Sequence, residues 1–257
     1  MGVPLLPEKY DSDPVLAPRG ASEYADDRGS GARSLPAAMV VCYAPVVLES
    51  VAERYDGTEV ADYRAGGSCY RLEATGGRVG IVGGFGVGAP ATALLLEGLF
   101  ASGVETVLLA GYAGCLADEV GPEDVIVPPS ALRDEGTSYH YRPPERYAPA
   151  DAALVEHVRE HLDAADVDYR VGPTWTTDAP YRETVAEVEA YAAEGVLTVE
   201  MEAAAAFAVA AHRERATAAL FTPSDYLVGT ERDPSTHDLD EALRRLGRLA
   251  VDAIEAY

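Results

Sequence analysis

The amino-acid sequence predicts an α/β fold in a single domain, with helices on both faces of a central sheet. Short apolar runs typical of strands alternate with amphipathic helical stretches over most of the 257 residues, and no internal repeat or linker interrupts them. The chain is also 48% hydrophobic, so it can bury enough apolar surface to offset the entropy that folding removes.

The elements follow one another in a regular order after an irregular start. Residues 1–35 are rich in Pro, Asp, Gly and Ser and predict an N-terminal arm, which leaves residues 36–257 as the folded domain. Strands are predicted where short apolar runs lie between turn residues, at 37–43, 69–75, 78–83, 105–110, 124–127, 196–199 and 216–221. Helices are predicted from apolar periodicity and from Pro or Gly near their ends, at 45–54, 90–102, 151–162, 181–194, 201–215 and 239–255.

The charge balance excludes several partners. The chain has 43 acidic residues against 20 Lys and Arg, a formal net charge of −23, and Lys9 is its one lysine. Such a field repels phosphates, so we expect no nucleic-acid partner. No apolar run of about 20 residues is present, so we expect no membrane partner. The N-terminus lacks the apolar core of a signal peptide, and an acidic surface suits a salty cytoplasm, so we expect a cytoplasmic protein.

The sequence also predicts that the protein works without a metal or an organic cofactor. Cys42, Cys69 and Cys115 are odd in number and form no CxxC pair, so we expect them to be reduced and buried. The five histidines show no metal-ligand spacing. A GxSxG nucleophile elbow and a Walker lysine are absent, which argues against serine hydrolases and NTPases.

Two glycine-rich segments stand at strand ends. Gly83–Pro90 joins a predicted strand to a predicted helix, a place where backbone N–H groups can bind an anion or a sugar, although a tight turn would also need its glycines. Its Gly86 and Gly88 match a dinucleotide-binding GxGxxA pattern, but the acid that should end the next strand, Glu105, begins it instead. Gly111-Tyr112-Ala113-Gly114 follows the strand at 105–110, where ligands bind in α/β sheets.

Two glutamates flank Met201 where a strand meets an alanine-rich helix. Burying Glu200 and Glu202 there costs free energy unless each finds a donor. The diol of a sugar offers two O–H donors to one carboxylate, so Glu202 is a candidate sugar ligand and Met201 a cover for the sugar face. The alternative, acids that favour a helix N-terminus, explains one glutamate more easily than both.

Two further polar segments follow predicted strands. Ser224-Asp225 comes after the strand at 216–221; Asp225 there can give a proton to a leaving group, or it can cap a turn. Residues 133–141 form a loop dense in charged, hydroxyl and phenol groups, a composition more common in functional loops than in structural ones.

Together these segments resemble the nucleoside phosphorylase/nucleosidase superfamily, and within it the uridine-phosphorylase-like branch. The resemblance spans roughly residues 37–227 and rests on the order of its motifs. These are Gly84-Phe-Gly86-Val-Gly88-Ala-Pro90, Gly111–Gly114, Val120–Val127, Arg133–Ser138, Thr176-Thr177-Asp178, Val199-Glu-Met-Glu202 and Ser224-Asp225. It implies a three-layer α/β/α domain with a twisted mixed central sheet and a homo-oligomer built from dimers, as a trimer or hexamer.

The resemblance also implies a reaction and its residues. A nucleoside would be cleaved by inorganic phosphate to free base and ribose 1-phosphate, with no other co-substrate. Glu200, Met201 and Glu202 would bind the ribose, and Asp225 would be catalytic, protonating a purine base. The base would lie near Thr176, Thr177 and Tyr181. Phosphate would contact Gly86, Gly88, Tyr112 and an Arg64 lent by a neighbouring subunit.

Because the chain departs from the family pattern, the sequence does not decide whether phosphate or water is the nucleophile, or whether the base is a purine or a pyrimidine. The phosphate-binding arginines of the first loop and of the strand before Gly111 are missing, with Leu109 in place of the second. Arg133, Arg142 and Arg182 are the candidates to replace them. We therefore keep two alternatives to phosphorolysis, a nucleosidase that uses water and a nucleoside-binding protein without turnover. Asp225 favours a purine, whereas the loop at 133–138 favours the uridine-phosphorylase branch.

Overall fold

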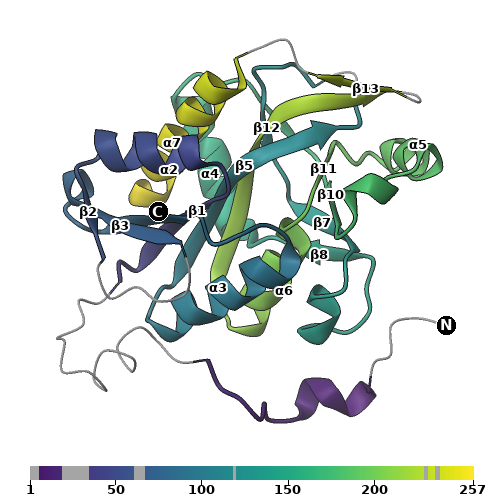
Figure 1. The fold of residues 1–257 in the computed structure, drawn as a ribbon, viewed down its shortest axis with the longest axis horizontal. Helices are drawn as coiled ribbons and strands as arrows, with labels where there is room; N and C mark the ends of the chain where they lie inside the picture. Colours follow the sequence, from purple (N-terminus) through teal and green to yellow (C-terminus); the bar gives the residue numbers. More distant parts are fainter. Residues whose placement is uncertain (1–5, 19–34, 61–66, 118–119, 229–230, 235–237) are drawn as a thin grey trace.

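The computed structural model describes residues 6–18, 35–60, 67–117, 120–228, 231–234 and 238–257 (Figure 1). The strands are β1 (Ala38–Cys42), β2 (Gly57–Glu59), β3 (Ser68–Leu72), β4 (Val79–Gly83), β5 (Thr106–Cys115), β6 (Val125–Val127), β7 (Ser130–Asp134), β8 (Tyr147–Pro149), β9 (Tyr169–Val171), β10 (Thr174–Thr177), β11 (Thr198–Glu200), β12 (Ala216–Val228) and β13 (Glu231–Pro234). The helices are α2 (Pro45–Arg54), α3 (Ala89–Ala101), α4 (Ala152–Ala164), α5 (Val185–Ala193), α6 (Ala203–His212) and α7 (Leu239–Ala256). Short 3-10 turns are η1 (Pro7–Asp11), η2 (Glu73–Thr75), η3 (Ser138–His140) and η4 (Pro180–Arg182).

The sheet is mixed, and β5 is its central strand. β1 runs parallel to β4 and to the first half of β5, while β12 runs parallel to β5 along its whole length. β1 pairs with β5 up to Ala110, and the antiparallel β11 takes over the same side of β5 at Gly114. The change of neighbour leaves a gap beside residues 111–113, the kind of switch point where α/β sheets bind ligands.

Side chains that alternate along the central strands build two cores. On β1, Met39 and Val41 pack with α3 and α6, whereas Val40 and Cys42 pack with α2, α4 and α7. Figure 1 shows α2 and α7 on one side of β1, β5 and β12, and α3 and α6 on the other. The predicted three-layer α/β/α arrangement with a mixed central sheet is therefore confirmed.

The structure corrects several predicted boundaries. β5 continues to Cys115 because β12 supplies backbone partners along its whole length, so Gly111–Gly114 is strand and not loop. β12 likewise continues past Phe221 to Val228. The helix predicted at 181–194 begins at Val185, because the Thr184 side chain accepts the Glu187 N–H and starts a new helix behind η4.

Other findings concern the arm, the cysteines and the membrane. Within the predicted N-terminal arm, residues 7–11 form the turn η1. The three cysteines are free and buried, as predicted. In the described ranges, no helix has the length and apolar character needed to cross a membrane.

Candidate active site

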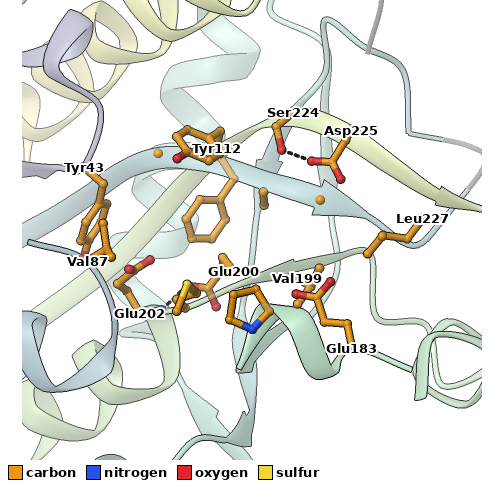
Figure 2. A pocket seen from close by; sticks show the side chains of 16 residues that line it. Tyr43, Val87, Tyr112, Glu183, Val199, Glu200, Glu202, Ser224, Asp225 and Leu227 are labelled. Atoms are coloured by element: carbon orange, nitrogen blue, oxygen red, sulfur yellow. Dashed lines mark hydrogen bonds between the residues drawn. The ribbon is translucent and has the colours of Figure 1, made fainter. Parts of the chain in front are cut away.

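A pocket of about 200 Å³ lies at the gap between β1 and β11 (Figure 2). Its walls come from the ends of β1 and β11, from the second halves of β5 and β12, and from η4 and the glycine loop before α3. The lining residues are Tyr43, Val87, Gly111, Tyr112, Ala113, Gly114, Pro180, Glu183, Val199, Glu200, Met201, Glu202, Phe221, Ser224, Asp225 and Leu227. All charged side chains among them are carboxylates.

Glu200 organises the start of α6. Its Oε2 accepts the backbone N–H groups of Glu202 and Ala203, each at 2.7 Å. Its Oε1 accepts the Thr176 hydroxyl at 2.5 Å, and the same Thr176 oxygen accepts the Ala204 N–H at 2.9 Å. These bonds satisfy N–H groups that a helix N-terminus leaves without partners. The cap that the sequence offered as an alternative role therefore belongs to Glu200.

Glu202 joins the glycine loop to the pocket. Its side chain is only 7% exposed, and its Oε1 accepts the Gly88 N–H at 2.5 Å. Gly88 has a φ of +91°, a backbone conformation that favours glycine and that turns this N–H toward the carboxylate. A carboxylate has about four acceptor positions, so Glu202 keeps capacity for a ligand in the pocket.

The two glutamates influence each other's protonation. Burial and the neighbouring charge of Glu202 raise the pKa of Glu200 to about 8, against hydrogen bonds from Thr176 and two backbone N–H groups, which lower it. Burial also raises the pKa of Glu202, against the N–H of Gly88, which lowers it. The pair therefore retains a proton at neutral pH.

Asp225 lies at the opposite end of the pocket from Glu202, as Figure 2 shows. The register between β12 and β5 shifts here, with Pro223 opposite Ala113 and Asp225 opposite Gly114. Ser224 is therefore the extra residue of a β-bulge, which re-aims the side chains beside it. The Ser224 hydroxyl donates to Asp225 Oδ1 at 2.5 Å, so the carboxyl group is held while it faces the cavity.

The end of the pocket near Asp225 is lined by residues that the sequence did not single out. Pro180 in η4 and Glu183 directly after it line this end, together with Val199 and Leu227. Tyr181, the predicted base contact, is instead 99% exposed and does not line the pocket. Side chains three positions apart lie on the same side of a 3-10 turn, so Pro180 and Glu183 both face the cavity, whereas Tyr181 faces solvent. The sequence predicted one continuous helix at 181–194, and its periodicity did not distinguish the directions of the Tyr181 and Glu183 side chains.

Thr176 and Thr177, the other predicted base contacts, are buried on β10 behind the pocket wall. Thr176 acts on the site through its bond to Glu200. The Thr177 hydroxyl accepts the Ala179 N–H at 3.2 Å and shapes the turn that leads to η4. Neither lines the pocket.

Two tyrosines also line the pocket. Tyr43, which the sequence did not single out, donates to or accepts from the Thr92 hydroxyl at 3.0 Å and stands beside Val87. Tyr112 lines the pocket and is 48% exposed, whereas Gly86 does not line it. Arg64 lies outside the described residues.

The candidate replacement arginines are not among the lining residues. Arg133 donates to Ser138 Oγ and to the carbonyls of Arg142 and Pro143, at 2.7–3.1 Å, so its guanidinium is used within its own loop. Arg182 lies exposed on η4. In the described part of the chain, no group of His, Cys, Asp and Glu side chains could hold a metal ion.

The pocket lies at a switch point of the sheet, and Glu200, Glu202 and Asp225 line it. This arrangement agrees with the comparison with known families. A model of the phosphorylase superfamily matches residues 37–256. The chain belongs to this superfamily, so the resemblance drawn from its motifs is confirmed. Its class is thereby defined as a pentosyltransferase-type enzyme.

Individual relatives are phosphorylases of purine nucleosides. The chain is 30% identical over 177 residues to the guanosine phosphorylase of Halorubrum lacusprofundi, which covers 66% of this chain and 73% of that protein. It is 31% identical over 166 residues to purine nucleoside phosphorylase DeoD-type 1 of Shewanella oneidensis, covering 63% and 70%. It is 27% identical over 214 residues to purine nucleoside phosphorylase DeoD-type 2 of Vibrio vulnificus, covering 81% and 89%.

Proposed function

We propose that this protein cleaves the N-glycosidic bond of a purine nucleoside with inorganic phosphate, giving free base and ribose 1-phosphate. One observation carries the proposal: Glu202 is buried in the pocket wall, fixed by the Gly88 N–H and still able to accept hydrogen bonds from a ribose diol. Glu200 supports this carboxylate by fixing the start of α6, and Met201 would cover the sugar face.

The base end favours a purine over a pyrimidine. Asp225 and Glu183 offer carboxyl oxygens at the end of the cavity away from Glu202. Guanine has neighbouring N1–H and N2–H donors that suit one carboxylate, and a ring N7 that can take a proton from a second. The names of the relatives, a guanosine phosphorylase and purine nucleoside phosphorylases, support the same choice. Purine preference replaces the uridine-like alternative in this proposal.

In the proposed reaction, the bond between C1′ and N9 breaks, and its electron pair goes to the purine. Asp225, held by Ser224, is the proposed general acid, which donates a proton to N7 and so neutralises the leaving base. The sugar develops oxocarbenium character, which the carboxylate of Glu202 stabilises through the hydroxyl groups it binds. A phosphate oxygen then forms the new bond to C1′, and no cofactor takes part.

Phosphate is proposed to enter at the end lined by Tyr112, below the glycine loop that contains Gly86 and Gly88, with Arg64 as its cation. Hydrolysis by water is the second candidate function. It is favoured by one observation, that the charged residues lining the described pocket are all acidic. Carboxylates repel a dianion and do not repel water.

The experiment is base release from guanosine, inosine, adenosine, uridine and methylthioadenosine in high potassium chloride, with phosphate present or removed. Phosphate-dependent release from purine nucleosides, lost in Glu202→Ala and kept in Glu189→Ala on the exposed face of α5, is the expected result. Release that ignores phosphate assigns the site to hydrolysis. Nucleoside affinity without release, abolished in Glu202→Ala, would make the protein a nucleoside-binding protein.

We also propose a homo-oligomer that works in a salty cytoplasm. Val87 in the loop before α3 and Leu94 on α3 are exposed apolar side chains, 63% and 73% exposed. A second copy of the chain is proposed to cover them, because the superfamily implied by the sequence assembles from copies. Light scattering tests this, with Leu94→Asp expected to shift the protein to monomer. The salty location rests on the net charge of −23.

A further inference from the structure

The sequence predicts a functional loop at residues 133–141, but none of its residues lines the pocket. It connects β7 to η3 and continues toward β8. Its charged and hydroxyl groups therefore need a different explanation from direct contact with the substrate.

The loop is a rigid unit built around two buried charged side chains. Arg133 is 4% exposed, bonds to Ser138 Oγ at 2.8 Å and stacks over the Tyr139 ring at 4.2 Å. Glu135 accepts the backbone N–H groups of Thr137 and Ser138, at 2.5 and 2.9 Å. Charge-assisted bonds of this kind are stronger than bonds between neutral groups, so the backbone of the loop is fixed in one conformation.

The N-terminal segment adds support from outside. The Tyr10 hydroxyl donates to the Tyr139 carbonyl at 2.8 Å, and Lys9 Nζ contacts His140 Nδ1. The loop is thus anchored to its own strand and to η1.

One hydrogen bond joins this rigid loop to the pocket wall. The Gly136 N–H donates to Asp178 Oδ2 at 2.8 Å. Asp178 follows β10 directly and precedes η4, which brings Pro180 and Glu183 to the base end of the pocket. Figure 2 shows Glu183 at that end, on the side away from Glu202.

Within η4 itself, few bonds fix the backbone. The described backbone bonds of this turn are Arg182 N–H to Ala179 carbonyl at 2.7 Å, and the next firm attachment is the capping box of Thr184 with Glu187. The position of η4 therefore depends on how its two ends are held. Asp178, through the Gly136 N–H, and Thr177, whose hydroxyl accepts the Ala179 N–H at 3.2 Å, hold the first end, and Thr184 holds the second.

We propose that Asp178 is a positioning residue, which fixes η4 to the rigid loop so that Pro180 and Glu183 keep the geometry that binds the base. The proposal rests on the proposed function, because it assigns the base to that end of the pocket. Asp178 does not touch the substrate in this account. It acts through η4, and the loop acts as the support.

The test compares Asp178→Ala, which removes the acceptor, with Asp178→Asn, which keeps an oxygen that can accept the Gly136 N–H. A net hydrogen bond is worth roughly a factor of three to ten in an equilibrium constant, so we expect Asp178→Ala to raise KM for the nucleoside by about that factor. We expect kcat to stay within about twofold, because Glu202 and Asp225 lie on other elements, and Asp178→Asn to keep the wild-type KM. An unchanged KM in Asp178→Ala, or a fall in kcat alone, would overturn the proposal.

A second measurement separates this proposal from the proposed function. Hydrogen–deuterium exchange of residues 179–184 should quicken in Asp178→Ala and not in Asp178→Asn or in Asp163→Ala, an exposed acid at the end of α4. This readout needs no turnover, so it stands if the wild-type protein releases no base. Equal exchange in all variants contradicts the positioning role even where the enzyme is active.

Discussion

The raised pKa of Glu200 makes the stability of the protein depend on pH in a direction that can be calculated. A glutamate in an unfolded chain has a pKa of about 4.3, whereas burial and Glu202 raise the pKa of Glu200 to about 8. Between these values the folded protein binds a proton at Glu200 that the unfolded chain has released. The free energy of unfolding therefore falls as pH rises through this window, and the loss is complete above the folded pKa.

The size of the effect follows from the shift. One pKa unit corresponds to about 1.36 kcal/mol, so this one group lowers the free energy of unfolding by about 4 kcal/mol between pH 5 and pH 8. Glu200→Gln removes the titration and keeps an oxygen that can accept the N–H groups of Glu202 and Ala203. The variant should therefore gain about 4 kcal/mol relative to the wild type across the same window.

The assay is guanidinium unfolding followed by circular dichroism at several pH values, in high potassium chloride. The difference between the free energies of unfolding of Glu200→Gln and wild type is plotted against pH. Glu189→Gln, on the exposed face of α5, carries the same change of net charge and serves as control. A Glu200→Gln curve parallel to that of the wild type would refute the reasoning, because it would mean that Glu200 is ionised throughout the window.

Four further predictions concern other parts of the molecule. Asp225→Asn should lower kcat/KM for purine nucleosides by about 10²–10⁴ with little change in melting temperature, because it removes only the proposed proton donor; steady-state assays and calorimetry check this. Gly88→Ala should lower the free energy of unfolding by roughly 1–2 kcal/mol, since φ is +91° there although the added Cβ finds space; Gly111→Ala is the matched control. Arg64→Gln should raise KM for phosphate at least about tenfold and leave KM for the nucleoside unchanged, and an unchanged phosphate KM would remove Arg64 from the site. The melting temperature should rise with potassium chloride, because salt screens the repulsion within a chain of net charge −23.

The sequence predicted the layers well because the sheet is buried on both faces. Runs such as Met39–Cys42 are apolar without interruption, and that pattern is typical of a strand covered on both sides. It also placed Glu200 and Glu202 at a strand-to-helix junction, where the structure finds them. The separate roles of these two residues depended on tertiary contacts, with Thr176 for Glu200 and Gly88 for Glu202.

The misjudged parts have two physical causes, a long-range strand pairing in β12 and a local helix cap at Thr184. Ser224 and Asp225 read as residues after a strand, because a bulge interrupts the alternation of polar and apolar side chains within β12. Tyr181 and Glu183 differ in direction only because η4 is a 3-10 turn that ends before the Thr184 capping box. A capping-box search at Thr184 would have found that boundary from sequence.

The acidic side chains that line the pocket limit which nucleophile it can bind. Two unit charges about 4 Å apart interact by about 4 kcal/mol near a protein surface, so a phosphate dianion beside Glu202 needs a cation of comparable proximity. The described lining supplies acids, phenols and backbone N–H groups. The retained proton on the glutamate pair removes part of the repulsion, but the Gly88 N–H before α3 is already donated to Glu202. A guanidinium from Arg64 would supply the rest, and without it the same pocket is better suited to water. In the proposed function, the choice between phosphorolysis and hydrolysis therefore depends on one cation near Tyr112, because the proposed binding of ribose by Glu202 and of the base near Asp225 is compatible with both reactions.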